Sequence, residues 1–260
     1  MRKIFTVIFL VLIAGNLLAQ KQKVNHMTTF DDKLLHFGFT LGMNTLDFGI
    51  VHYNPIGSNP DFTTPPANTW YPDEERITGN HFVRADIEEV IPGFTVGIVS
   101  SLRLTRDLNL RFLPGLSFGE RILTYNQLVV DYTTSGFSNR TYDYSVKSTF
   151  LDFPLLIKYK ARRINNDRPY VIFGGAYRQD ISRTGGEDLV RLTNGGFYAE
   201  IGAGWDHYFT FFRFSVEAKV SLGLNNQLGD PPQGDNQRKY YTHAFESLRS
   251  NIFTLCFHFE

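Results

Sequence analysis

Charged residues recur at two-residue spacing inside apolar stretches of this sequence. In FFRFSVEAKVSLGL, for example, Arg213, Glu217 and Lys219 lie on the parity opposite to the apolar side chains from Phe212 to Leu224. Successive side chains of a strand point to opposite faces of a sheet, so these charges would share one face and form ion pairs across strands. The predicted members of this network are Arg103, Arg111, Asp152, Lys158, Arg178, Glu200, Asp206, Arg213, Glu217 and Lys219.

A second set of reactive residue types lies in polar segments between the apolar stretches. A hydrolase could be built from Ser, His and Asp groups that meet at one point. Scattered His and Asp residues are also expected by chance in long polar loops, and nothing in their spacing fixes a common geometry, so we predict no catalytic activity. The candidates are His52, His81, Asp86, Asp180 and His243.

The sequence contains few residue patterns that could bind a metal ion or a cofactor. His36 and His258 share the polar face of the first and last apolar stretches, but two histidines make an incomplete metal site, so a contact at the closure of a sheet is the better interpretation. Cys256 lies on the same face and is expected to be a packed small residue. No CxxC, HExxH, GxSxG or phosphate-loop motif occurs, and we predict neither a metal nor a cofactor.

The N-terminal residues and the composition limit the class of protein. Arg2 and Lys3 precede an unbroken apolar run, and Ala19 follows it, which predicts a signal peptide over 1–19. We expect 20–33 to be a periplasmic segment and 34–260 a single domain. Lys and Arg together number 26, as do Asp and Glu, so no basic footprint suggests a nucleic-acid partner.

Eight stretches alternate apolar and polar residues in the way that strands do. They span 34–44, 93–104, 109–119, 150–160, 169–179, 196–207, 211–224 and 251–260. Pro114 lies within the third stretch and predicts a bulge. Short turns join the second stretch to the third, the fourth to the fifth, and the sixth to the seventh, whereas 51–90, 125–145, 180–194 and 225–250 are expected to be long loops. This arrangement predicts an all-β, eight-stranded antiparallel up-and-down barrel.

The face that the apolar side chains occupy decides between a membrane barrel and a soluble one. A lipocalin-like barrel turns its apolar face inward. The interior of an eight-stranded barrel is only just wide enough to be filled by side chains, so about forty large apolar residues would not fit inside it. Many glycines share the other face with the charges, as a narrow filled lumen requires. We therefore predict a transmembrane barrel of the bacterial outer membrane, with the lipid bilayer and its lipopolysaccharide around it. In such a lumen the charged residues could form a gate that senses a partner, but salt bridges that fill the narrow interior are the favoured interpretation.

The last stretch, NIFTLCFHFE, carries an aromatic signal typical of barrel assembly. Phe253, Leu255, Phe257 and Phe259 would face lipid, and the strand would close the ring by pairing with the first stretch near His36. Such a strand resembles the one that barrel-assembly machinery recognises, so we expect it to direct insertion into the membrane.

Three segments resemble the PorT family of outer-membrane barrels from Bacteroidetes-type bacteria. They are LRFLPGLSFGER (110–121), FLDFPLLIKYKARRINNDRPYVIFGG (150–175) and the aromatic C-terminal strand. The most specific motif runs from Asp152 through Pro154-Leu155-Leu156 to Lys158-Tyr159. The resemblance implies a non-catalytic, accessory role in type IX protein secretion, with other secretion proteins as partners of the outer loops.

The loops leave an alternative open. A general outer-membrane protein could use them for adhesion, for binding or for handling a small solute. The first loop carries exposed aromatic residues suited to a protein partner, although it could equally shield the rim of the barrel. These residues are Tyr53, Phe62, Trp70 and Tyr71.

Overall fold

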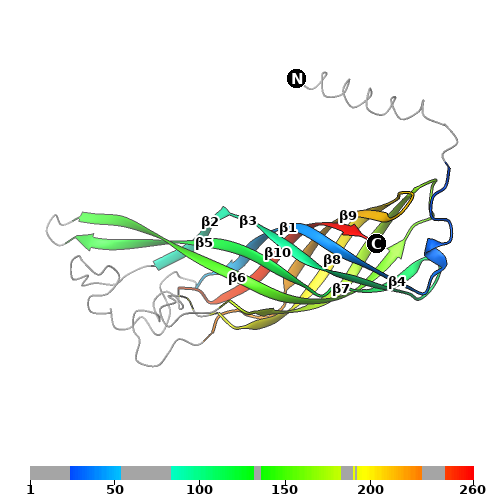
Figure 1. Ribbon diagram of the computed structural model, residues 1–260. Coiled ribbons are helices and arrows are strands. Elements are labelled where there is room, and N and C mark those ends of the chain that lie inside the picture. Colours follow the sequence, from blue (N-terminus) through cyan, green and yellow to red (C-terminus); the bar gives the residue numbers. More distant parts are fainter. Residues whose placement is uncertain (1–23, 54–82, 132–135, 183–189, 191, 230–243) are drawn as a thin grey trace, which may run out of the picture.

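The computed structural model describes residues 24–53, 83–131, 136–182, 190, 192–229 and 244–260. In this part of the chain one 3-10 helix, η1 (Phe30–Asp32), precedes ten strands of a single sheet (Figure 1). The strands are β1 (Leu35–Val51), β2 (Val83–Val90), β3 (Pro92–Arg103), β4 (Leu108–Phe112), β5 (Gly115–Asp131), β6 (Gly136–Lys160), β7 (Asp167–Asp180), β8 (Gly195–Tyr208), β9 (Arg213–Gly223) and β10 (Ser247–Phe259).

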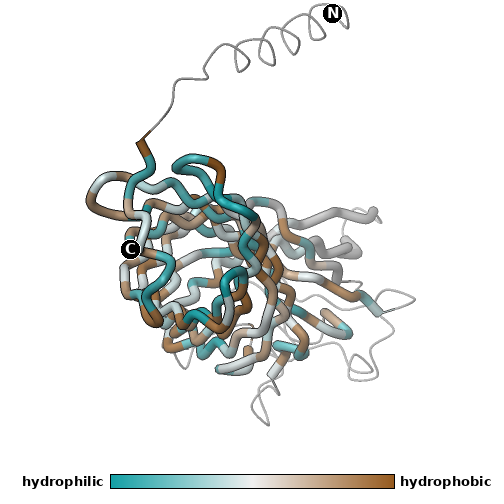
Figure 2. The backbone as a smooth tube through the Cα atoms, turned by 90° about the vertical axis from the view of Figure 1, so that its right-hand side faces the viewer, coloured by the Kyte–Doolittle hydropathy of each residue, from teal (hydrophilic) through white to brown (hydrophobic). Residues whose placement is uncertain are grey.

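The sheet closes on itself as a ring of eight antiparallel strands, which confirms the predicted fold. Around the ring, β1 pairs with β10, and β9, β8, β7 and β6 follow in order. β4 and β5 act as one strand between β6 and β3, and β3 returns to β1. Figure 2 shows the ring from one end, with the view directed along the barrel axis. Closure pairs the backbone groups of every strand in the ring and leaves no open edge there.

Pro114 interrupts the third predicted strand without creating the expected bulge. Ser100 of β3 pairs with Phe112, and Gly97 pairs with Gly115, so both strands advance by the same number of residues across the interruption. Pro114 has no N–H to donate, but its carbonyl oxygen accepts from Ile98 N at 2.9 Å. Because Pro114 lacks this N–H group, β4 ends before it and β5 begins after it. The register of pairing with β3 is unchanged across the gap.

The connections between strands differ at the two ends of the barrel. Short turns join β3 to β4, β6 to β7 and β8 to β9 at one end, here called the turn end, where the C-terminus also lies (Figure 1). The prediction of a long loop over 125–145 at the opposite, loop end is wrong. There β5 and β6 continue as a paired hairpin as far as Asp131 and Gly136.

This hairpin becomes a three-stranded extension at the loop end, because β2 pairs along β5. β2 lies inside the segment predicted as a long loop over 51–90, so that prediction is also wrong in part. A register shift between Ile87 and Glu89 allows β2 to follow the twist of the hairpin. The extension projects beyond the barrel wall in Figure 1.

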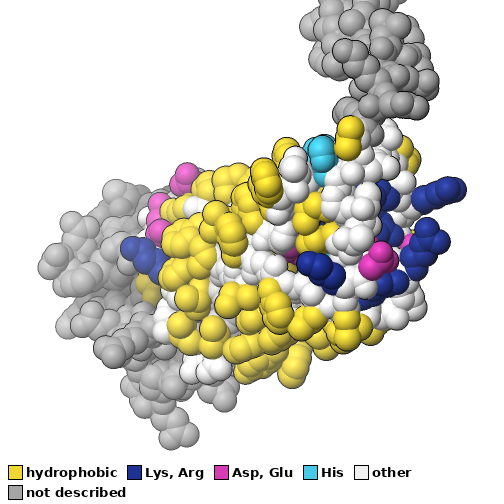
Figure 3. All heavy atoms as spheres, turned by 45° about the vertical axis from the view of Figure 1, so that its right-hand side comes forward, with side chains coloured by type: hydrophobic (Ala, Val, Ile, Leu, Met, Phe, Trp, Pro, Cys, Tyr) yellow, Lys and Arg dark blue, Asp and Glu magenta, His cyan; other side chains and the backbone are white. Residues whose placement is uncertain are grey.

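The outer wall of the barrel is apolar. Phe39, Ile98, Phe173, Phe197 and Ile201 are among many large apolar side chains exposed on it. Figure 3 shows hydrophobic side chains covering the wall, with charged side chains at its two ends and most of them at the turn end. Among the described residues, no helix is long and apolar enough to cross a membrane.

Glycines on the inner face make room for large polar side chains. A Cβ atom on Gly204 would lie 2.4 Å from Tyr170 Cζ, so only glycine at this position allows the Tyr170 ring to lie across the strand. A Cβ atom on Gly202 would lie 2.5 Å from the carbonyl oxygen of Ala218 and 2.8 Å from Lys219 Cβ, so glycine there allows β8 and β9 to lie close together. These two glycines of the inner face thus leave room for a large aromatic side chain and for close strand approach.

Candidate functional site

Glu217 is the centre of a buried polar group in the barrel interior. Its carboxylate accepts a hydrogen bond from Arg111 Nη1 at 2.7 Å and another from Tyr170 Oη at 2.9 Å. His258 Nε2 lies 3.4 Å from the other oxygen of the same carboxylate. The side chains come from β9, β4, β7 and β10, so this one carboxylate links strands on several sides of the barrel.

A second group lies between Glu217 and the turn end. Lys158 Nζ donates to Asp206 Oδ1 at 2.8 Å, and Ser215 Oγ donates to the same oxygen at 2.6 Å. Arg213 bonds to Glu260, the last residue of the chain, whose other carboxylate oxygen lies 3.5 Å from Arg111 Nη2. Through Arg111, the C-terminal residue connects this group to the Glu217 group.

A third group lies on the loop-end side of Glu217 and is organised by Arg178. Its guanidinium donates to Asp152 Oδ1 at 2.9 Å and to Glu200 Oε1 at 2.5 Å. Lys219 Nζ donates to the second oxygen of Glu200 at 3.1 Å, and Ser221 Oγ also donates to Glu200. Each charge in this group thus faces a partner of opposite sign.

The interior becomes apolar towards the loop end. A buried cluster there combines residues from β1, β2, β5 and β10 with residues from the connections that follow β7 and β9. Its members are Phe48, Ala85, Leu123, Tyr125, Val190, Ala244, Phe245 and Leu248. Arg121 lies beneath this cluster with its guanidinium 3.8 Å from the centre of the Phe48 ring, and it donates to Ser148 and Ser250 at 2.9 Å.

The segment 24–33 covers the turn end of the barrel. Phe30 stacks on the His36 ring with centroids 4.2 Å apart, and Arg213 lies 4.8 Å from the Phe30 ring centre. Asn166, in the turn between β6 and β7, accepts from the backbone N–H of His26 and donates to the carbonyl of Val24. Side-chain contacts and backbone hydrogen bonds thus hold this segment across the opening.

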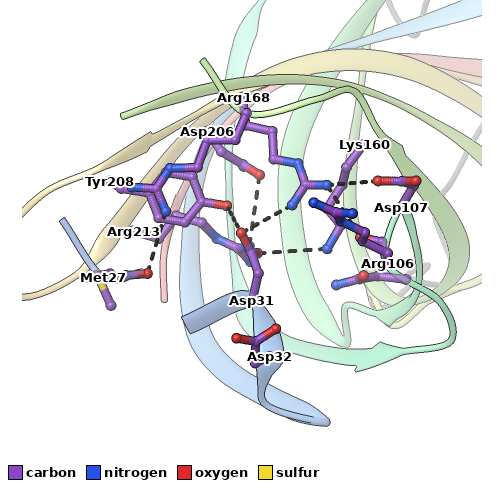
Figure 4. A network of polar contacts seen from close by, with 12 residues as sticks. Met27, Asp31, Asp32, Arg106, Asp107, Lys160, Arg168, Asp206, Tyr208 and Arg213 are labelled. Carbon is purple, nitrogen blue, oxygen red and sulfur yellow. Dashed lines mark hydrogen bonds and ion pairs between the residues drawn. The ribbon is translucent and has the colours of Figure 1, made fainter. Parts of the chain in front are cut away.

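Asp31 is the charged anchor of this segment (Figure 4). Tyr208 Oη donates to its carboxylate at 2.7 Å, and Arg168 Nη1 lies 3.1 Å from the same oxygen. Lys160 and Arg213 lie 3.7 and 3.6 Å from the other oxygen. Burial raises the pKa of Asp31, but the Tyr208 hydrogen bond and the three positive charges together act more strongly, and the pKa lies below its ordinary value of 3.8.

Asp31→Asn should therefore loosen the segment 24–33. A hydrogen bond to a charged group contributes about 1.5–3 kcal/mol, so we expect amide hydrogen exchange in 24–33 to accelerate by about tenfold or more. Because the pKa of folded Asp31 is lowered, its stabilising effect is present above pH 3.8 and is lost as the pH falls through the lowered value. The matched control is Asp32→Asn, whose exposed carboxylate lies 3.6 Å from Arg103. Equal acceleration in both variants would contradict the role of Asp31.

The structure places most of the predicted network residues inside the barrel and one at its edge. Arg103 lies at the turn-end rim with 30% of its side chain exposed, and its nearest partner is Asp32. It ends β3 and so projects past the filled part of the lumen. The other nine predicted residues are buried.

The expected contact between His36 and His258 is wrong. His258 pairs across the seam with Thr40, and His36 pairs with Ser101 of β3, so the closing register is displaced by four residues along β1. Strands of a barrel are staggered around the ring, and parity alone does not fix that stagger. Cys256 is buried on the inner face beside these residues.

The residues considered for catalysis do not come together in the described part of the chain. Asp180 accepts from the backbone N–H groups of Thr149 and Ser182, and Asp86 accepts from the N–H of Ile87. His52 follows the end of β1. His81 and His243 lie outside the described residues, as do Phe62, Trp70 and Tyr71 of the first loop and the predicted signal peptide.

Several members of the network were not predicted from the sequence. Glu260 continues the parity of Thr254, Cys256 and His258, so the alternation that predicts the last strand already places it inside. Tyr170 also lies on an inward parity, opposite Val171. Asp31 has no such signal, because it precedes the strands and lies in a 3-10 turn.

The four predicted residues of the last strand lie on the outer face, beside the closing seam. Phe259 stacks on Phe39 of β1 with ring centroids 4.8 Å apart, and Phe257 stacks on Phe214 of β9 at 6.2 Å. Phe253 and Leu255 continue the row along β10. Aromatic contacts thus connect the last strand to both of its neighbours.

The arrangement can fill and stabilise a narrow lumen, because the cations and carboxylates of its three polar groups are paired across strands. Among the described residues, no group of three or more His, Cys, Asp or Glu side chains is placed to hold a metal ion. Comparison with known proteins gives one family. A family model described as "Outer membrane protein beta-barrel domain" matches residues 18–229. No curated protein and no solved structure is significantly similar to the chain.

Proposed function

The chain belongs to the family of outer membrane protein β-barrel domains and lies in the bacterial outer membrane, and from this premise we propose that it acts as a sealed, non-catalytic accessory component of protein secretion. The observation that carries this proposal is the filled interior. Two of its polar groups share Arg111 and Glu260, which connect Glu217 to Arg213. The apolar cluster lies at the loop end and the segment 24–33 at the turn end.

A filled barrel suits a protein that holds a position in the membrane and offers surfaces to partners. Side chains that are fully buried and paired in the lumen would have to separate before a solute could pass. The three-stranded extension of β2, β5 and β6 offers a further surface beyond the barrel wall. Binding residues are often carried by connecting segments that a rigid scaffold positions.

The finer part of the proposal is a role in type IX secretion. It is supported by the likeness of 110–121, 150–175 and the C-terminal strand to the PorT family. The segment 150–175 supplies Asp152 and Lys158, which bond to Arg178 and Asp206 in the interior. Residues of the segment that resembles the PorT family therefore also form ion pairs that fill the lumen.

Deletion of the gene tests the secretion role. Cargo proteins that bear the C-terminal secretion signal should accumulate inside the cell and fall in the medium, and the wild-type gene supplied in trans should restore export. A matched measurement of outer-membrane integrity, such as sensitivity to a large antibiotic, separates loss of export from general damage to the envelope. Normal export in the deletion strain would exclude the role.

The second candidate is a general outer-membrane protein whose loops bind a partner or handle a small solute. Solute passage requires an open lumen, so planar-bilayer recording separates it from the sealed component. We expect the purified barrel to give no stepwise conductance. Regular conductance steps would favour the solute role.

A further inference from the structure

A pocket of about 860 Å³ opens at the turn end of the barrel. Its walls come from the segment 24–33, the turn between β3 and β4, and the turn between β6 and β7. Its charged lining residues are Asp31, Asp32, Arg103, Arg106, Asp107, Lys160, Arg162, Arg163 and Arg168. Figure 4 shows Asp31, Lys160 and Arg168 converging in this region, with Arg106 and Asp107 beside them.

The three carboxylates of the pocket already have partners. Asp31 faces Lys160 and Arg168, and Arg168 also lies 3.2 Å from Asp107. Asp32 faces Arg103 at 3.6 Å. Each negatively charged side chain of the lining is therefore paired with a positively charged side chain of the same pocket.

Three cations of the pocket have no carboxylate partner in the part of the chain that the structure describes. Among the described residues, Arg106 and Arg162 form no ion pair with an acidic side chain, and both are exposed. Arg163 bonds to backbone carbonyls, including that of Asn165 at 2.7 Å, and to the Asn166 side chain. The lining thus has three more positive than negative side chains, and a bound anion would relieve their mutual repulsion.

The deep wall of the pocket is buried. Lys160 is 1% exposed and Arg168 is 5% exposed. The contact of Lys160 Nζ with Asp31 is 3.7 Å long, and its ammonium group donates no hydrogen bond to any described residue. An ammonium carries three donors, so Lys160 retains hydrogen-bonding capacity at this wall.

We propose that this pocket binds a phosphate group. A phosphate carries up to two negative charges and several acceptor oxygens, which match the surplus of positive charge and the forked donors of arginine better than a single carboxylate does. Tyr159 also lines the pocket and lies on the outward parity of β6 with 53% of its surface exposed. The pocket therefore borders the lipid-facing wall, and the phosphate can belong to a free anion or to a phospholipid head group. The site does not depend on the secretion role.

Calorimetric titration of the full mature chain in non-ionic detergent tests the site, with inorganic phosphate as the first probe. The key variant is Arg106→Ala with Arg162→Ala, because neither side chain supports the fold through an ion pair. We expect binding to weaken by about tenfold or more, as the loss of two charge-assisted contacts implies. The matched control is Lys147→Ala with Arg249→Ala, which removes two exposed cations elsewhere on the chain and should leave the affinity unchanged.

A second arm separates the two sources of phosphate. The chain is placed in nanodiscs of phosphatidylcholine with or without phosphatidylglycerol, and retained lipids are counted by native mass spectrometry. Binding of inorganic phosphate that the Arg106 and Arg162 variant loses supports a soluble ligand, and selective retention of phosphatidylglycerol with the same loss supports a head group. The proposal is overturned if neither probe binds, if the variant binds both probes as the parent does, or if hexaglutamate binds more tightly than either probe.

Discussion

Replacing Glu217 by Gln should lower the free energy of unfolding of the barrel by roughly 3–5 kcal/mol, the usual cost of removing one partner from a buried ion pair. Glu217 is fully buried and accepts from Arg111 and Tyr170, and His258 lies beside it. The amide of Gln keeps the size of the side chain but removes its charge, so Arg111 would lose the closer of its two carboxylate partners. Glu260, at 3.5 Å, would remain.

Urea unfolding in detergent micelles or lipid vesicles measures this effect, with the folded fraction scored by the gel shift that heating abolishes. The matched control is Glu89→Gln, the same chemical change at an exposed position of β2. We expect the control to change the free energy of unfolding by less than about 0.5 kcal/mol, as surface substitutions usually do. Equal effects in the two variants would contradict the central position of Glu217.

A companion variant distinguishes loss of charge from loss of packing. Arg111→Met combined with Glu217→Leu removes both ions and keeps apolar volume at both positions. Buried ion pairs replaced in this way often cost little, so the double variant should be more stable than Glu217→Gln alone. A double variant that is less stable would show that Tyr170, His258 and Glu260 depend on the pair for their own positions.

The strict alternation of residue types explains why the sequence predicts the barrel so well. In 211–224 every second residue is apolar, and the structure places Val216 and Val220 outside and Glu217 and Lys219 inside. Parity decides which face a side chain occupies, because a strand has a period of two. The parity of one strand is therefore available from local sequence alone.

The stagger between strands and the extent of pairing at the loop end are not local properties. The four-residue displacement of His258 from His36 depends on the whole ring, since each strand pair contributes to the total shear. The hairpin of β5 and β6 runs through a polar stretch whose alternation is irregular, and β2 pairs along part of it. Asp31 is similar, because its role depends on Lys160, Arg168 and Arg213, which are brought together by the fold.

Changing both Phe257 and Phe259 to Ser should reduce the amount of assembled barrel in the outer membrane several-fold. Phe259 contacts Phe39 and Phe214, and Phe257 contacts Phe214, so the double change removes aromatic contacts on both sides of β10. Each aromatic pair contributes about 0.5–1.5 kcal/mol beyond the burial of its surface. The seam between β1 and β10 joins the first and last strands of the ring, so losing these contacts weakens its closure.

Heat-modifiable protein in purified outer membranes, measured against total protein in the cell, gives the assembled fraction. The matched control is Phe173→Ser with Phe197→Ser, which removes two exposed aromatic side chains from the outer wall on β7 and β8. If the seam and the terminal strand direct assembly, the C-terminal variant should lose far more assembled barrel than this control. Equal losses would mean that the apolar surface as a whole drives insertion. A further comparison, refolding of both variants into lipid vesicles without any assembly machinery, separates the two roles of the strand: a defect confined to cells indicates recognition by the machinery, and a defect in both settings indicates failure of the seam itself.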